Sequence, residues 1–282
     1  MPASKSRGTR SALAAVLHRR LGVAAFLFAT VSITALAQTR DFSSYARLDR
    51  DQVRSALAIA SEGNPASLSG VNLSGEDLSA VDFRGARMNA SVFNGANLSK
   101  ADLSGCDLTV SFAEGTDFRG ARLKRAVLFS VLAKGADFRD ADLTGARLIG
   151  DFSGANFERA VLRETNAAAD MKNQSMGLMR ANLPSANLRG ADLSDSDFSR
   201  AVMTFTDLTG ARLARTKLRG AEFAGTRFND ADLRGADLGD SKFIDADFTG
   251  ADLRGANFRD ATFRGVIGLD RAQIEGASGL PR

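Results

Sequence analysis

Few side chains of this sequence are suited to acid–base or nucleophilic catalysis. The single histidine, His18, lies within the first 37 residues, and the single cysteine is Cys106. Beyond the N-terminal segment, hydrolytic triads, histidine-based proton transfer and zinc sites of the His/Cys kind therefore lack their usual residues. No GxxxxGKS or GxxxxGKT phosphate-binding loop is present. An enzyme built on this chain would have to rely on its 33 Asp and Glu residues, and we expect neither a cofactor nor a metal.

These residues sit within a pattern that repeats every fifth position. A large apolar residue occurs at each fifth position from Leu178 to Phe263 and, apart from Ala113 and Ala133, from Leu68 to Leu148, with a small residue two places earlier almost throughout. A helix, with a period of about 3.6, and a strand, with a period of about 2, cannot place such rows on one side. The pattern instead predicts a solenoid that turns a corner every fifth residue. Cys106 falls in the small row, which predicts a buried, unreactive thiol.

The units ADLSG, ANLSK, ADFRD, ADLTG and ANFRD, found between Ala96 and Asp260, resemble the A-(D/N)-(L/F)-x-x unit of the pentapeptide-repeat family. The resemblance covers about three quarters of the chain. It implies an all-β solenoid, a right-handed quadrilateral β-helix with four pentapeptides per coil, in which the large and small rows both point inward. The outward Asp or Asn residues suit turns because their side chains hydrogen-bond to the backbone.

Residues one coil apart should stack in this fold, so Asp117 and Asp137, or Asp232 and Asp252, are expected side by side. Such pairs either hold turns on a solvated face, which we favour, or bind a cation such as calcium.

The first 37 residues contain five basic residues and no acidic one. A basic stretch to Arg20 is followed by an uncharged apolar run, 21–37, that ends in Ala35-Leu36-Ala37. This arrangement predicts a secretory signal peptide, 1–37, cleaved between Ala37 and Gln38. An uncleaved signal anchor is the alternative, although the 17-residue run is short for a membrane span. We therefore expect a periplasmic or secreted bacterial protein with no stable membrane span after cleavage.

Two regular repeat regions, 66–148 and 178–267, are expected between short α-helical caps. In the N-terminal segment, 38–65, Asp49 and Gln52 form a capping box for a helix ending near Ser61. The sequence LDRAQI in 268–282 repeats that pattern and predicts a C-terminal capping helix and tail. The region 149–177 is irregular, with large residues one position out of phase and then a loop over Arg163–Gly177. Because the original phase later returns, we favour one continuous solenoid over two segments joined by a hinge.

Val92, Phe112 and Leu132 occupy outward positions 20 residues apart, where most units carry a polar residue. One interpretation is an exposed apolar stripe, which would be a docking surface. The other, which we favour, is a slip of phase that turns Phe112 and Leu132 inward, because small alanines follow both. Candidate partner-binding residues are therefore this stripe together with Arg163 and Lys172 of the loop.

The body of the chain is close to neutral, because 32 basic residues remain beyond the N-terminal segment against 33 acidic ones. Nucleic acid is therefore not an expected partner. The predicted function is that of an exported, noncatalytic scaffold or protein-binding module, with an unknown protein or envelope partner. The family resemblance implies an alternative, since some members mimic duplex DNA and bind a topoisomerase, DNA gyrase, through an acidic surface. The near-neutral body and the signal peptide disfavour it. A carboxylate-based enzyme is a further alternative.

Overall fold

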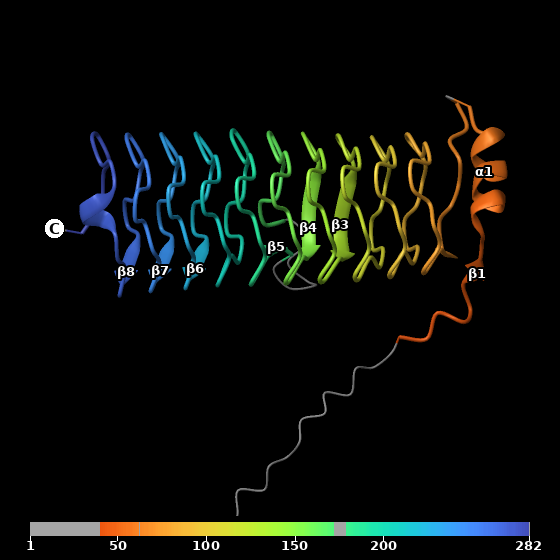
Figure 1. Ribbon diagram of the computed structural model, residues 1–282, viewed down its shortest axis with the longest axis horizontal. Helices are drawn as coiled ribbons and strands as arrows, with labels where there is room; N and C mark the ends of the chain where they lie inside the picture. Colours follow the sequence, from red (N-terminus) through yellow and green to blue (C-terminus); the bar gives the residue numbers. More distant parts are fainter. Residues whose placement is uncertain (1–39, 62, 172–178, 282) are drawn as a thin grey trace, which may run out of the picture. The chain divides into compact units, whose positions relative to one another are not determined.

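A computed structural model describes residues 40–61, 63–171 and 179–281, which form a β-solenoid (Figure 1). The chain turns at every fifth residue and pairs in parallel with itself one coil later, as in the rungs Asp102↔Arg122 and Arg122↔Asp142. The large residues lie inside, and Leu103 and Leu123 in these coils have no exposed surface. The predicted quadrilateral solenoid of pentapeptide repeats is confirmed.

The corners explain the residue types of the repeat. From Gly70 to Gly145 and from Ser185 to Gly265, every fifth residue has a positive φ. The outward Asp or Asn closes each corner by accepting a backbone hydrogen bond, for example from the Ser79 N–H to Asp77 Oδ1 at 3.1 Å. Small inward residues that carry a hydroxyl donate to a carbonyl of the previous coil, as Thr226 Oγ1 does to the Met203 carbonyl at 2.6 Å. The polar groups of the corners are thereby satisfied locally.

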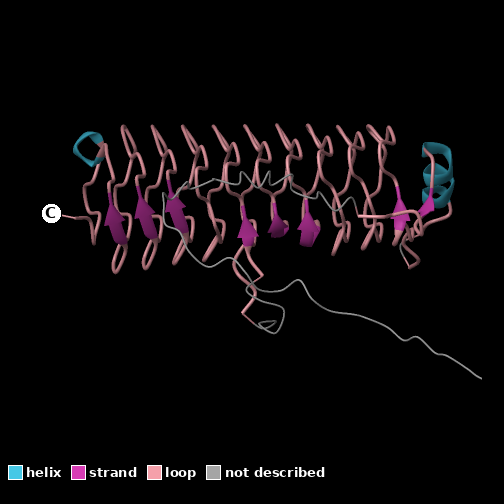
Figure 2. Ribbon diagram, turned by 90° about the horizontal axis from the view of Figure 1, so that it is seen from below, coloured by secondary structure: helices cyan, strands magenta, loops and turns pink. Residues whose placement is uncertain are grey.

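Extended runs are short because every side bends after a few residues. The strands are arranged in three parallel sheets, β1–β2, β3–β4–β5 and β6–β7–β8 (Figure 2). The elements are β1 Ala46–Arg47, α1 Arg50–Ala58, β2 Val71–Asn72, β3 Val127–Leu132, β4 Arg147–Asp151, β5 Ala181–Asn182, β6 Glu222–Ala224, β7 Lys242–Ile244, β8 Thr262–Arg264 and a 3₁₀ turn, η2, Leu269–Arg271. Among the described residues, no helix is both long and apolar enough to cross a lipid bilayer.

The phenylalanines of the core stack along the solenoid axis. The Phe243 ring lies parallel to those of Phe223 and Phe263, with centroids 5.1 and 5.2 Å away. On the neighbouring side, Phe228 and Phe248 stack at 4.8 Å. Rings spaced by one coil therefore form continuous ladders, as the 20-residue spacing predicts.

Helix α1 covers the N-terminal end of the solenoid, as expected. Its capping box is present: the Gln52 N–H donates to Asp49 Oδ1, and the Asp49 N–H donates to Gln52 Oε1, both at 2.9 Å. Val53 is fully buried. The helix ends at Ala58, short of the expected Ser61.

The predicted C-terminal capping helix is wrong. Only the single turn η2 forms, after Gly268, and the chain then rejoins the ladder in the pair Asp252↔Gln273. The Gln273 N–H donates to the Ala251 carbonyl, and the Leu253 N–H donates to the Gln273 carbonyl. A helix of so few residues would gain few internal bonds, so pairing with the preceding coil is favoured.

The irregular region is part of one continuous solenoid, as we favoured. Asp137 pairs with Asn156, so this coil is one residue shorter than the usual 20. Asn156 pairs with Asn187, so the next coil has 31 residues. The residue is lost opposite Ser130, where the β3–β4 register shifts. The added residues leave the ladder at Asp170, which forms an antiparallel pair with Met179. The short coil lacks one residue and the long coil has eleven extra. The net gain of ten residues is a multiple of five, so the five-residue repeat continues in its original phase.

Candidate functional site

The favoured phase slip is wrong, because Val92, Phe112 and Leu132 keep their outward positions. They form consecutive rungs, Val92↔Phe112 and Phe112↔Leu132, while Ala113 and Ala133 are buried inside. Neighbouring rungs such as Asp107↔Val127 and Asp117↔Asp137 hold the same 20-residue spacing. A slip by one residue would break this ladder and turn every side chain of the segment to the opposite face. The apolar stripe is therefore real.

A segment from the N-terminus, Asp41–Tyr45, crosses part of this stripe, and we call it the strap. At one end it leads into β1, which pairs with β2 on the rung before Val92. At the other end the Phe42 ring lies 4.9 Å from the Phe112 ring, on the rung after Val92. The strap therefore passes over Val92, which explains why this outward side chain has no exposed surface.

Apolar residues continue from the stripe around the adjoining corner of the solenoid. Val110 lies at this corner in one coil, and Phe129 of β3 lies beside it in the next coil. The Val110 N–H donates to the Phe129 carbonyl, Phe129 pairs with Ile149, and Leu132 and Met179 line the same hollow. Val110 is 49% exposed at φ +61°, which is costly for a β-branched residue. We call the following set the apolar corner: Val110, Phe112, Phe129, Leu132, Ile149 and Met179.

The pair Asp170↔Met179, at which the chain leaves the ladder and returns to it, borders this apolar corner. Arg147 lies over the Phe129 ring at 4.9 Å and forms an ion pair with Asp170 at 3.4 Å. A hollow of about 410 Å³ opens between Leu132, Ile149 and Met179, with Arg180, Asp151 and Asn182 on its rim. A cavity of this size accommodates an apolar side chain of a partner.

The other two predicted partner residues do not join the corner. Arg163 was expected in the loop, but it lies in a regular coil and pairs with Asp195 at 3.8 Å. The ladder continues through Asn166↔Asp197, so the loop begins later than expected. Lys172 lies outside the described residues.

Gly150 shapes the corner at the point where the coil loses a residue. Its φ is +150°, and a Cβ atom there would lie 2.1 Å from the Val131 carbonyl oxygen. Only glycine lets β4 come this close to β3. The hollow beside Leu132 therefore depends on this residue.

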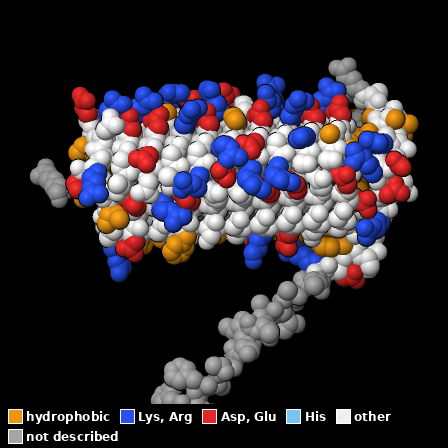
Figure 3. All heavy atoms as spheres, viewed as in Figure 1, with side chains coloured by type: hydrophobic (Ala, Val, Ile, Leu, Met, Phe, Trp, Pro, Cys, Tyr) orange, Lys and Arg blue, Asp and Glu red, His pale blue; other side chains and the backbone are white. Residues whose placement is uncertain are grey.

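Much of the remaining surface is polar and internally paired, although Ile59, Phe205 and Ile267 are also exposed. Figure 3 shows basic and acidic side chains intermingled over one face, with several hydrophobic side chains along its lower edge. The stacked carboxylates considered as a cation site are bridged by arginines. Arg119 contacts Asp117 at 2.7 Å and Asp137 at 3.9 Å, and Arg234 bridges Asp232 and Asp252 in the same manner. In the described ranges, no group of three or more metal-ligating side chains comes together.

Two largely buried titratable groups, Asp207 and Cys106, have pKa values far from neutral pH. Burial opposes ionisation of Asp207, but hydrogen bonds from Thr209, Arg227 and Arg189 outweigh it and lower the pKa to about 2. Burial raises the pKa of Cys106 to about 12, and its Sγ donates to the Phe83 carbonyl at 3.0 Å. General acids and bases work best with a pKa near the operating pH.

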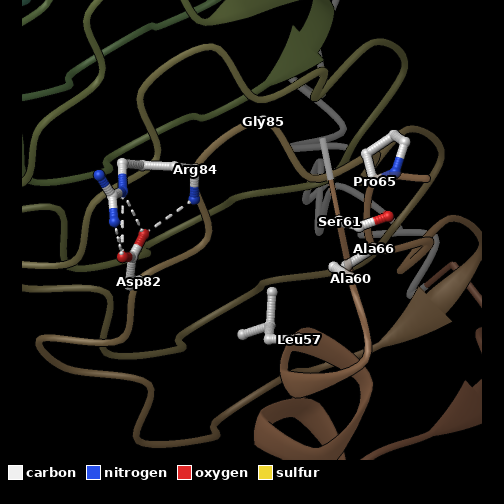
Figure 4. A pocket seen from close by; sticks show the side chains of 8 residues that line it. All are labelled: Leu57, Ala60, Ser61, Pro65, Ala66, Asp82, Arg84 and Gly85. Atoms are coloured by element: carbon white, nitrogen blue, oxygen red, sulfur yellow. Dashed lines mark hydrogen bonds and ion pairs between the residues drawn. The ribbon is translucent and has the colours of Figure 1, made fainter. Parts of the chain in front are cut away.

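A second hollow, of about 750 Å³, lies between the end of α1 and the first coil (Figure 4). Its charged residues, Asp82 and Arg84, are joined by a hydrogen-bonded ion pair of 2.6 Å. The Arg84 hydrogen bond lowers the pKa of Asp82. Since each charge is already matched by the other, this hollow offers little to bind a charged ligand.

Several apolar residues at outward positions of the unit were missed from the sequence, of which Ile149 is fully buried. Val110 and Phe205 occupy corner positions where glycine or a polar residue is usual, and Phe205 is 67% exposed at φ +56°. Phe129 and Ile149 each follow a buried leucine directly, where most units carry a polar residue. A bulky residue at these two positions of the unit is the signal that would have found them.

Comparison with solved structures gives matches of low overall superposition. A pentapeptide repeat protein, HetL, involved in heterocyst differentiation regulation in the cyanobacterium Nostoc, is 26% identical over 82% of this chain and 96% of its own, with a TM-score of 0.34. QnrB1, a plasmid-mediated fluoroquinolone resistance protein, is 20% identical over 73% of this chain and 90% of its own, with a TM-score of 0.32. A thylakoid-lumen protein of Arabidopsis thaliana is 34% identical over 32% of this chain and 61% of its own, with a TM-score of 0.31. No curated protein sequence matches the chain.

Family-level comparison is more specific. The pentapeptide repeats family matches in eight copies, which cover more than half of the chain at residues 66–109, 121–150, 178–213, 206–243, 231–267 and 241–278. The matched segments lie within the coils of the solenoid, and they omit α1 and residues 151–177. The chain belongs to the pentapeptide-repeat family.

Proposed function

We propose that this protein is an exported, noncatalytic binding module that holds a protein partner at the apolar corner. The observation that carries this proposal is the contrast between that corner and the rest of the surface. Elsewhere most outward positions hold polar or charged residues, many of them joined in ion pairs. Here six apolar residues from four consecutive coils gather beside a hollow, and all of them except Ile149 have exposed surface. Contiguous apolar surface with a polar rim is typical of a protein interaction site.

Rigidity supports the same function. The corner is built on backbone ladders and carries a strained valine, so its side chains are held in place before binding. A preformed surface loses little conformational entropy on association. Export is inferred from the sequence of residues 1–37, which lie outside the described residues. An exported protein would meet its partner in the bacterial envelope or beyond.

The test removes the corner while keeping the fold. Val110→Gly and Leu132→Asn restore residues that the same columns carry elsewhere, as in Gly70 and Asn72, so the solenoid should stay intact. The control pair, Val161→Asn and Ile267→Asp, changes two outward apolar residues that lie in other columns of the solenoid, and the second restores the residue type of Asp247 in the same column.

Both variants and the parent protein are used as bait on solubilised envelope. We expect the corner variant to lose a partner that the parent and the control pair retain. Retention of every partner by a folded corner variant would refute the proposal.

A further inference from the structure

The strap is a short, sparsely bonded segment. The hydrogen bonds described for it are internal: the Ser43 N–H donates to Asp41 Oδ1 at 2.8 Å, and the Tyr45 N–H donates to the Phe42 carbonyl at 3.0 Å. The Tyr45 ring packs edge-on against Phe42 at 5.6 Å. Asp41, Ser43 and Ser44 are exposed, so the strap touches the solenoid chiefly through its two half-buried aromatic residues.

Phe42 packs on Phe112 of the apolar corner, and we call the place where its ring rests the slot. Phe112 forms one wall, with its ring at 57° to that of Phe42, and Val92 lies beneath the strap on the neighbouring rung. The slot therefore accepts an aromatic ring from an extended segment whose flanking residues are small and polar. The ring is only half-buried, and the hydrogen bonds described for the strap are internal to it, so this docking is readily reversible.

We propose that the slot beside Phe112 is a docking site for an aromatic side chain in an extended segment of the partner, and that Phe42 occupies it in the free protein as an internal competitor. This inference rests on the proposed function, because it names how the apolar corner is controlled and which chemistry it binds. A tethered ligand is present at a high effective concentration, so a partner must displace it, and its apparent affinity is reduced accordingly.

The probe is a blocked peptide with the sequence of residues 40–45, RDFSSY, titrated into the purified protein. Binding is followed through the methyl NMR signals of Val92 and Leu132, which flank the slot. We expect Phe42→Ala to bind the peptide at least 10-fold more tightly than the parent protein, because the competitor is gone. The same peptide with its phenylalanine replaced by alanine should bind neither protein.

Phe112→Asn removes the slot and restores the residue type found at Asn72 and Asn182 in the same column, so it should fold and show no peptide-dependent shifts. Equal titrations for the parent and Phe42→Ala, or equal binding of the peptide without its phenylalanine, would overturn the inference. Peptide-dependent shifts of the Val202 methyl signals instead of those of Val92 would also overturn the inference, because Val202 lies five rungs further along the same column.

The titration uses no cellular partner, so its outcome is independent of the envelope capture. If the corner variant loses its partner while Phe42→Ala leaves the titration unchanged, the competition is refuted and the binding function stands. If capture survives in the corner variant, the binding function is refuted whatever the peptide does.

Discussion

Replacing Phe243 with alanine tests the energetics of the ring ladder most directly. The side chain is fully buried at the centre of a cluster of five other rings. The substitution removes a phenyl group and leaves a cavity that the ladder backbone cannot close, because the coils above and below are held at a fixed spacing.

The expected loss follows from two contributions. Truncation of a buried phenylalanine costs about 3–5 kcal/mol through lost transfer free energy and the cavity. Phe243 also stacks on Phe223 and Phe263, and because such pairs contribute about 0.5–1.5 kcal/mol each beyond area burial, the loss should lie toward the upper end of this range rather than outside it. We therefore expect a loss in the upper part of that range, about 4–5 kcal/mol. Phe243→Leu restores the commoner residue of this row and should cost less than about 1.5 kcal/mol.

Equilibrium denaturation in guanidinium gives the free energy of unfolding, and hydrogen exchange shows which coils open. Because each coil contacts only its neighbours, the C-terminal coils should lose protection first. The control is Phe205→Ala, which removes an exposed phenyl group at a corner and should change stability by less than about 0.5 kcal/mol. A loss below about 1 kcal/mol for Phe243→Ala, or an equal loss for the control, would refute the reasoning.

Three further outcomes are expected. Gly150→Ala should destabilise the protein by at least about 2 kcal/mol more than Gly135→Ala in thermal melts, because a Cβ at Gly150 meets the adjoining strand whereas Gly135 has open space; equal melting temperatures would contradict this. Asp207 has a folded pKa of about 2 against an ordinary 3.8, so its contribution of about 2 kcal/mol is present above pH 4 and is lost as the pH falls through 2. Asp207→Asn, a residue that the same face carries at Asn187, should flatten this acid dependence, and an unchanged pH profile would contradict the assignment. Mass spectrometry of protein from the envelope fraction should find Gln38 at the N-terminus, and recovery of only the uncleaved chain would refute export with cleavage.

The five-residue period was enough to predict the solenoid, the inward rows, the burial of Cys106 and the ring ladders through Phe243. Each of these follows from the direction of the side chain at one position of the unit, which is repeated identically in every coil. The capping box of α1 is local in the same sense, because Asp49 and Gln52 interact within one helical turn.

The candidate site was decided by contacts between residues distant in the sequence. Size alone favoured turning Phe112 and Leu132 inward, and only the ladder hydrogen bonds of neighbouring coils show that they face outward. LDRAQI carries a helix signal that pairing with the preceding coil overrides. Phe42 reaches Phe112 across a span that no repeat describes, and Met179 joins the corner because one coil is a residue short and the next is longer. A repeat determines what all coils share; the tertiary structure decides where they differ.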